Sequence, residues 1–162
     1  MRRDVLLPSR PLSGVRVGLK DMIPIAGVPL TFGSAVLRNY VPDFDSELTR
    51  RLLEAGAEIV AVTNMEAFAF SGGGETCAAG PVLNSVDPAR TACGSSNGSA
   101  AGLAYNDSTL AWGTDSGGSV RIPARSSGGS STRPTPGGTL RRPGSVSTGL
   151  RYGPTGRRRR RP

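Results

Sequence analysis

Residues 14–21, Gly-Val-Arg-Val-Gly-Leu-Lys-Asp, alternate apolar and polar side chains as a β-strand does and end in a polar pair. Residues 46–55 then favour a helix, and residues 58–63, Glu-Ile-Val-Ala-Val-Thr, predict a second, buried strand. Strand, helix and strand follow one another with short connections. This order indicates an α/β layer architecture.

The helix carries signals at both ends. Asp45 or Ser46 can cap its N-terminus, and Gly56 can end it. Its buried face is expected to carry Leu48, Leu52 and Leu53.

The second half of the chain is dominated by small residues. Residues 71–98 are rich in Gly, Ser, Pro and Asn and predict mostly loop. The alanine-rich segment 99–105 favours a helix. Residues 109–112 predict a short strand that enters the turn 113–119, Gly-Thr-Asp-Ser-Gly-Gly-Ser.

Three absences narrow the possible chemistry. The chain has no histidine, which excludes a Ser-His-Asp triad, a Cys-His pair and a histidine-ligated metal. Cys77 and Cys93 lack metal-site spacing and are interpreted as reduced thiols, so no metal is expected. No apolar run is long enough to cross a membrane, so we expect a cytoplasmic protein without membrane contact.

Charge divides the chain into two parts. Residues 1–124 have a net charge of −2, whereas residues 125–162 contain ten arginines and no acid. We therefore expect a partial α/β domain over 1–124 and a disordered Arg/Gly/Ser/Pro-rich tail over 125–162. The overall basic charge therefore gives no reason to expect nucleic-acid binding by residues 1–124. The basic tail could bind nucleic acid, and the alternative is that the tail has no binding role.

Serine chemistry without histidine requires another base. A serine hydroxyl is a weak nucleophile until a base takes its proton, and only carboxylates and Lys20 are available here. Lys20 is the only lysine, beside nineteen arginines. A lysine at the end of an apolar strand can be held neutral by burial, although an ordinary surface lysine is the alternative.

Two serine-bearing segments could work with such a base. Residues 94–99, Gly-Ser-Ser-Asn-Gly-Ser, can fold tightly and bring hydroxyls close to other groups; a flexible loop is the alternative. In the turn 113–119, backbone N–H groups precede Ser119 and could stabilise an oxyanion. The alternative for this turn is an incidental serine beside glycines.

The three segments together resemble the amidase signature family of serine hydrolases. Lys20 precedes Ser95 by 75 residues, and Ser95 precedes Ser119 by 24. Further matching stretches lie between them, including Leu53-Glu54-Ala55-Gly56-Ala57 and Asp87-Pro88. The resemblance implies a partial amidase signature fold, with a mixed β-sheet core flanked by helices.

The resemblance also implies a Ser-Ser-Lys mechanism with an acyl-enzyme intermediate. Ser119 would attack the carbonyl, and Ser95, often on a cis peptide in the family, would relay the proton to neutral Lys20. Asp115 and Arg121 would orient the turn. The oxyanion would be held by the backbone N–H groups of Ser116, Gly117, Gly118 and Ser119.

The implied activity is hydrolysis of linear carboxamides. The expected partner is a small-molecule amide, and no cofactor is expected. A subunit of a tRNA-dependent amidotransferase shares these motifs and is the alternative function. A third possibility is a non-catalytic fragment with a nucleic-acid-binding basic tail.

The sequence departs from the family pattern in several places. Cys93 and Asn97 replace family glycines in the Ser-Ser loop. After Ala124 the family continues with an apolar strand, whereas residues 128–135 are mostly Gly, Ser and Thr. Family members are more than twice as long, so the sequence is interpreted as a truncated member, a fragment that lacks part of the substrate pocket.

Overall fold

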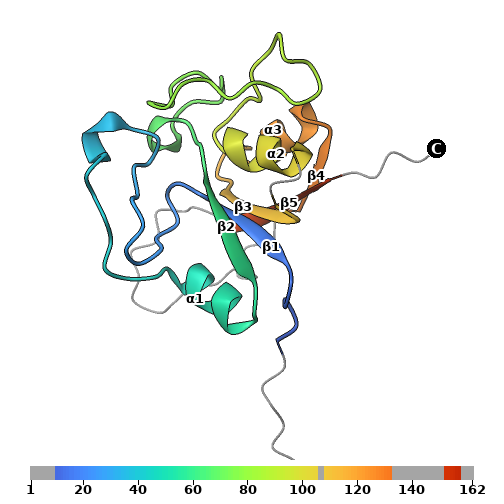
Figure 1. Ribbon diagram of the computed structural model, residues 1–162. Coiled ribbons are helices and arrows are strands. Elements are labelled where there is room, and N and C mark those ends of the chain that lie inside the picture. Colours follow the sequence, from blue (N-terminus) through green and yellow to red (C-terminus); the bar gives the residue numbers. More distant parts are fainter. Residues whose placement is uncertain (1–9, 106–107, 133–151, 158–162) are drawn as a thin grey trace, which may run out of the picture.

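The computed structural model describes residues 10–105, 108–132 and 152–157 (Figure 1). In this part of the chain, two short 3-10 helices accompany three α-helices and five strands. In chain order they are β1 (Arg16–Lys20), η1 (Ala35–Leu37), α1 (Glu47–Glu54), β2 (Glu58–Thr63), η2 (Ala67–Ala69), α2 (Asn97–Ala104), β3 (Leu110–Thr114), α3 (Arg121–Ser126), β4 (Gly129–Ser131) and β5 (Tyr152–Arg157).

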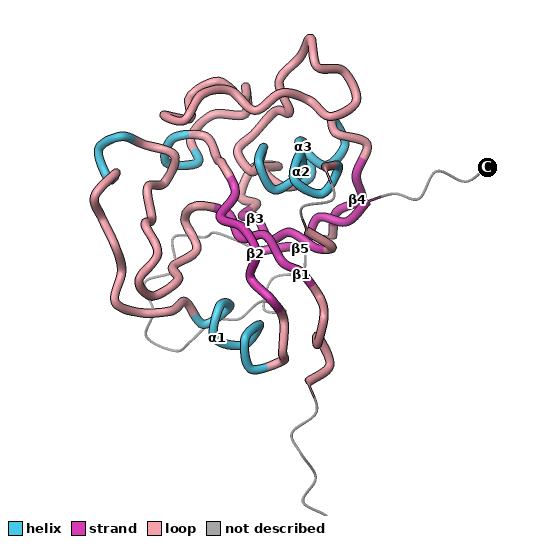
Figure 2. The backbone as a smooth tube through the Cα atoms, viewed as in Figure 1, coloured by secondary structure: helices cyan, strands magenta, loops and turns pink. Residues whose placement is uncertain are grey.

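The strands form one mixed sheet in the order β2-β1-β3-β5-β4 (Figure 2). Strand β1 runs parallel to both of its neighbours, β2 and β3, while β5 is antiparallel to β3 and β4. Helix α1 lies on one side of the sheet, and α2 and α3 lie on the other (Figure 1). The expected α/β class, a mixed sheet flanked by helices, is confirmed.

Strand β1 is more buried than β2, β3 and β4. Four of its five residues are buried, because neighbouring strands and helices cover both of its faces. Val17 and Leu19 pack with Leu48 and Leu52 of α1 in the main apolar cluster. The alternation seen in the sequence therefore does not mark a solvent-facing side, and Lys20 lies inside the protein.

Helix α1 forms as the capping signals predict. The Ser46 hydroxyl accepts a hydrogen bond from the Thr49 N–H at 3.1 Å, and Gly56 adopts a positive φ just beyond the helix. Leu52 is buried, but Leu53 is 46% exposed, so its predicted place on the buried face is wrong. One residue turns the helix by about 100°, which carries Leu53 away from that face.

Strand β2 is present over the predicted residues but is not buried. It lies at the edge of the sheet, and only Thr63 among its six residues is buried. Val60 and Val62 are 37% and 40% exposed. An apolar run predicts a strand without showing how many of its faces are covered, which explains the wrong prediction.

Described elements continue past residue 124, where the sequence predicts the basic tail to begin, and the division into two parts stays a prediction. Helix α3 spans residues 124 and 125, and β4 and β5 extend the sheet beyond it. Residues 133–151 and 158–162 lie outside the described residues, so disorder across the basic tail stays a prediction. Among the described helices, none combines the length and apolar character that spanning a membrane requires.

Candidate active site

Lys20 is the last residue of β1, and its side chain is completely buried. The Lys20 Nζ donates hydrogen bonds to Ser95 Oγ at 2.7 Å and to Thr114 Oγ1 at 2.8 Å. Thr114 is the last residue of β3, the parallel neighbour of β1. The carboxyl ends of adjacent parallel strands meet at one edge of the sheet, which is where α/β proteins usually place their sites.

Burial changes the protonation of Lys20. Removal of the amine from water lowers the pKa of Lys20 from 10.5 to about 7, against the opposing attraction of Asp115 and Glu66. A large neutral fraction is therefore present at neutral pH. The ordinary surface lysine, left open by the sequence, is excluded.

Ser95 reaches Lys20 from the loop before α2. The peptide bond between Gly94 and Ser95 is cis, as the family resemblance implies, and Ser95 is completely buried. The Ser95 carbonyl accepts a hydrogen bond from the Glu66 N–H at 3.1 Å. The loop is thus a fixed element and not a flexible Gly/Ser linker.

Ser119 lies beside this loop, although its hydroxyl does not complete a hydrogen-bonded chain. The Ser96 N–H donates to the Ser119 carbonyl at 3.1 Å, which ties the two serine-bearing segments together. No described residue hydrogen-bonds to the Ser119 hydroxyl. The structure therefore joins Lys20 and Ser95 directly and brings Ser119 next to them through the backbone.

Asp115 organises the turn that carries Ser119. Its carboxylate accepts hydrogen bonds from the N–H groups of Gly118, Val120 and Arg121 at 3.0–3.2 Å. The Arg121 guanidinium adds two bonds of 2.9 Å. Burial alone would raise the pKa of Asp115, but these bonds outweigh it and hold the pKa at about 2. The expected orienting role of this pair is confirmed.

The four N–H groups predicted for the oxyanion are not equivalent. The Gly118 N–H already donates to Asp115 Oδ1 at 3.0 Å. The N–H groups of Ser116, Gly117 and Ser119 donate to no acceptor in the described part of the chain. Three backbone N–H groups of the turn are thus available to a ligand, and the N–H of Gly118 is already bonded to Asp115.

Two residues at the centre were missed in the sequence. Thr114 stands in the Gly-Thr-Asp motif directly before Asp115, so its position carried a signal. Glu66 carried none that separates it from other acidic residues, yet it is completely buried and acts on Lys20.

The Cys93 substitution has a backbone consequence. Cys93 adopts a φ of 59°, in the left-handed region that favours glycine, whereas Asn97 is the first residue of α2. Of the two residues that replace family glycines, Cys93 is thus the one with a strained backbone conformation.

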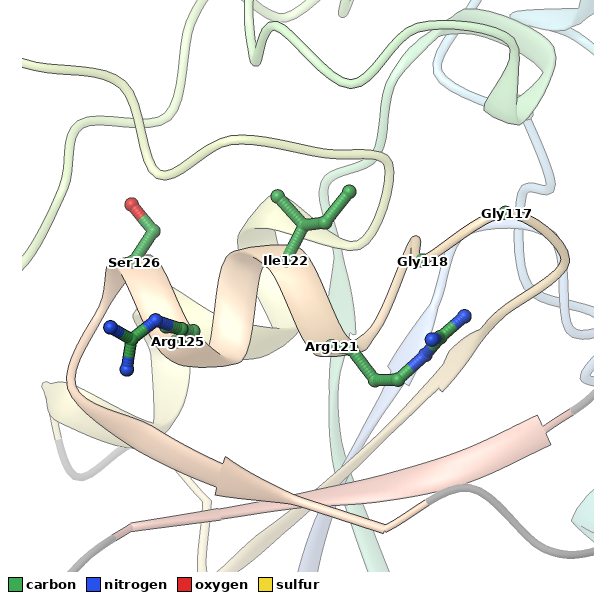
Figure 3. Close-up of a pocket in the computed structure, with 6 residues that line it drawn as sticks. All are labelled: Gly117, Gly118, Arg121, Ile122, Arg125 and Ser126. Carbon is green, nitrogen blue, oxygen red and sulfur yellow. The ribbon is translucent and has the colours of Figure 1, made fainter.

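A hollow of about 450 Å³ runs along α3 (Figure 3). Figure 3 shows two glycines of the turn at one end of it and the last residues of α3 at the other. Lys20, Ser95 and Ser119 do not line it, so it adjoins the serine turn without containing the Lys20–Ser95 pair. Its lining residues are Gly117, Gly118, Arg121, Ile122, Arg125 and Ser126.

The fold and the site together define a class of protein. The protein is an α/β protein in which a buried lysine at a strand end is hydrogen-bonded to a serine on a glycine-rich loop. No histidine is available to serve as the base of this centre.

Comparison with known proteins identifies the family within that class. The family model described as Amidase matches residues 3–146. The chain belongs to the amidase family.

Individual relatives agree with this assignment. The chain is 43% identical over 131 residues to a glutamyl-tRNA(Gln) amidotransferase subunit from Acidothermus cellulolyticus, covering 81% of the chain and 26% of the relative. The corresponding subunit from Natronomonas pharaonis is 47% identical over 125 residues, covering 77% and 30%. The crystal structure of native peptide amidase from Stenotrophomonas maltophilia superposes with a TM-score of 0.81 at 34% identity, covering 92% and 32%. The chain thus spans between a quarter and a third of the length of these proteins.

Proposed function

We propose that this protein is an amidase-type hydrolase that cleaves the C–N bond of linear carboxamides through a Ser119–Ser95–Lys20 triad. The observation that carries the proposal is the 2.7 Å hydrogen bond between the buried Lys20 amine and Ser95 Oγ. Because burial lowers the pKa of Lys20 to about 7, the amine is available as a base at neutral pH.

The proposed proton path runs through two hydroxyls. Neutral Lys20 accepts the proton of Ser95, and Ser95 accepts the proton of Ser119 as Ser119 Oγ attacks the amide carbon. Collapse of the tetrahedral intermediate breaks the C–N bond, and the proton returns through Ser95 to the departing amine. Water then attacks the Ser119 ester and releases the acid.

The oxyanion is assigned to the turn before the nucleophile. The open N–H groups of Ser116, Gly117 and Ser119 support this assignment. Participation of Gly118 requires its N–H to leave Asp115. The hollow along α3 is lined by Gly117 and Gly118, which supports an approach of the substrate to this turn.

The chemistry requires only groups on the chain and a water molecule. The triad supplies nucleophile and base, so the proposal includes a small-molecule amide substrate and no cofactor. A cytoplasmic location is also part of the proposal. It is supported by Cys77 and Cys93, which are both free thiols and suit a reducing compartment.

A second candidate function is that of an amidotransferase subunit, in which released ammonia passes to a second site. It is favoured by the names of the two relatives at 43% and 47% identity. The two functions share the same serine centre. Ammonia release from free amides without a partner protein supports the amidase, whereas release only in the presence of a co-purifying partner supports the amidotransferase.

A fluorophosphonate probe tests the serine centre directly. We expect one adduct, located on Ser119 by peptide mass spectrometry, and its loss in Ser119→Ala. Lys20→Met should slow labelling at least about 100-fold, because general base catalysis contributes roughly 10²–10⁴-fold. Labelling that persists in Ser119→Ala, or that is equally fast in Lys20→Met, would contradict the proposal.

A further inference from the structure

Glu66 is a completely buried carboxylate that the proposed mechanism does not use. It follows β2 and occupies the N-cap position of η2, where its side chain makes no capping hydrogen bond. Its Oε1 accepts a hydrogen bond from Asn97 Nδ2 at 2.9 Å. Its Oε2 accepts three more, from the N–H groups of Glu75 and Thr76 at 3.2 Å and from Thr76 Oγ1 at 2.8 Å.

These four donors explain how the charge is tolerated. Burying a carboxylate without partners is costly, so buried carboxylates are normally paired or fully hydrogen-bonded. Among the described residues, no arginine or lysine forms an ion pair with Glu66. Neutral donors from two separate segments, residues 75–76 and the first residue of α2, therefore stabilise the Glu66 carboxylate.

The Ser95 loop rests directly on Glu66. The Glu66 N–H donates to the Ser95 carbonyl at 3.1 Å, and a Cβ built on Gly94 would lie 2.5 Å from Glu66 Cγ. Asn97 follows Ser95 by two residues and donates a hydrogen bond to the Glu66 carboxylate. Glu66 thus contacts the loop before and after Ser95.

We propose that Glu66 is a positioning residue, which with Asn97 fastens the Ser95 loop and so holds the Ser95 hydroxyl against the Lys20 amine. The bond to Glu66 requires the side-chain amide of Asn97, and a glycine at this position could not form it. The part of the proposal that concerns Lys20 rests on the proposed function.

Two carboxylates act on Lys20, and two further charged groups on neighbouring segments must be separated from them in a test. Glu66 follows β2, and Asp115 follows β3; both carboxylates attract the ammonium form. Asp21 follows Lys20 in the chain and is bonded to the N–H of Thr31. Arg121 on α3 is paired with Asp115. Removing the Glu66 charge leaves the other three in place.

The first experiment uses the single lysine of the chain. With lysine labelled with ¹³C at Cε, the protein gives one side-chain resonance, whose pH titration reports on Lys20 alone. We expect Glu66→Gln to lower the titration midpoint by about 1 pH unit, because a negative charge that favours the ammonium form is removed. Glu66→Asp keeps the charge and should restore part of the shift, and Glu58→Gln, an exposed carboxylate on β2, should change nothing.

The outcomes separate the two proposals. A wild-type midpoint near 10 would overturn the proposed function, because Lys20 would then be charged at neutral pH. A wild-type midpoint near 7 that Glu66→Gln leaves unchanged would overturn the role of Glu66 and leave the proposed function intact.

The second experiment tests the loop without changing any charge, and it applies even if Glu66→Gln fails to fold. Asn97→Ala removes the amide, whose Nδ2 donates to Glu66 and whose Oδ1 accepts a hydrogen bond from the Gly98 N–H at 2.9 Å. Hydrogen exchange of the Ser96 and Glu66 backbone N–H groups should accelerate about tenfold or more, since a bond to a charged acceptor is lost. Exchange of the Ala57 N–H, at the far end of the sheet, should stay unchanged. Unaltered exchange at Ser96 and Glu66, or the same acceleration at Ala57, would overturn the positioning role.

Discussion

Lys20 Nζ lies 2.7 Å from Ser95 Oγ, although 75 residues separate the two in the chain. The contact depends on the β1–β3 pairing, which places the end of β1 beside Thr114, and on the packing of α2 against the sheet. Lys20 is thus fully buried among hydroxyl groups. Its lowered pKa follows from this enclosure, and the predictions below follow from the contact.

The labelling rate of Ser119 should depend on pH through Lys20. As the pH falls through about 7, the amine becomes protonated and can no longer accept the proton from Ser95. We expect the fluorophosphonate labelling rate to fall about tenfold for each pH unit below 6. A rate that is flat between pH 5 and pH 8 would show that another group is the base.

Replacement of Lys20 by methionine should stabilise the fold at acidic pH. The folded state lowers the pKa of Lys20 from 10.5 to about 7, so the unfolded state binds more protons between these values. Wild-type stability should therefore rise as the pH goes from 7 to 10.5. At pH 6, Lys20→Met should gain about 1–3 kcal/mol in the free energy of unfolding, and the gain should shrink as the pH rises. Urea denaturation at pH 6, 8 and 10 measures it, and a Lys20→Met gain that is constant with pH would contradict the burial argument.

Thr114 should matter through its hydroxyl. The Thr114 Oγ1 accepts the second hydrogen bond of Lys20, at 2.8 Å. Thr114→Val keeps the shape and removes the acceptor, which should cost about 1 kcal/mol of stability and slow Ser119 labelling about tenfold. Thr114→Ser retains the hydroxyl and serves as the control. Equal labelling rates in the two variants would exclude a role for this bond.

Asp115 should be essential for the turn. Its carboxylate holds three backbone N–H groups and the Arg121 guanidinium. Asp115→Asn should destabilise the protein by about 2–3 kcal/mol, because buried donors lose their partner. The pKa of Asp115 is held at about 2 in the folded protein. The contribution of this carboxylate to the free energy of unfolding is therefore fully present above pH 4 and is lost as the pH falls through 2. Chemical denaturation at pH 7 checks the loss, with the exposed Glu54→Gln as control; a loss no larger than that of the control would contradict it.

Cys93 should tolerate glycine better than a branched side chain. Its φ of 59° lies in the left-handed region, where a β-branched residue is most strained. Cys93→Val should lower the free energy of unfolding by about 1–2 kcal/mol, whereas Cys93→Gly should stay within about 1 kcal/mol of the wild type. Thermal unfolding of both variants decides the order, and equal melting temperatures would argue against strain at this position.

Local sequence patterns were sufficient to predict where the strands and helices lie, but not which of their faces are buried. Alternation and capping residues located β1 and α1, because both signals act over a few residues. The exposure of β2 depends on which strands lie beside it, and the sequence of β2 alone does not contain that information. Leu53 failed for a similar reason, since the width of the buried face of α1 is set by the sheet beneath it.

The sequence also pointed to only some of the residues that form the candidate site. An ordered set of motifs pointed to Lys20 and Ser95, which the structure shows in contact, and to Asp115 and Arg121, which it shows paired. Glu66 was missed because its importance comes from four hydrogen bonds that converge from distant loops. The strain at Cys93 was missed because φ follows from the path of the loop.

The most direct test of the central claim is the pKa of Lys20 itself. In the wild-type chain, the single ¹³Cε resonance of lysine should titrate with a midpoint near 7 and show the shift of a neutral amine at pH 9. A midpoint close to the ordinary lysine value of about 10.4 would mean that the amine is charged and hydrated, and it would contradict the account.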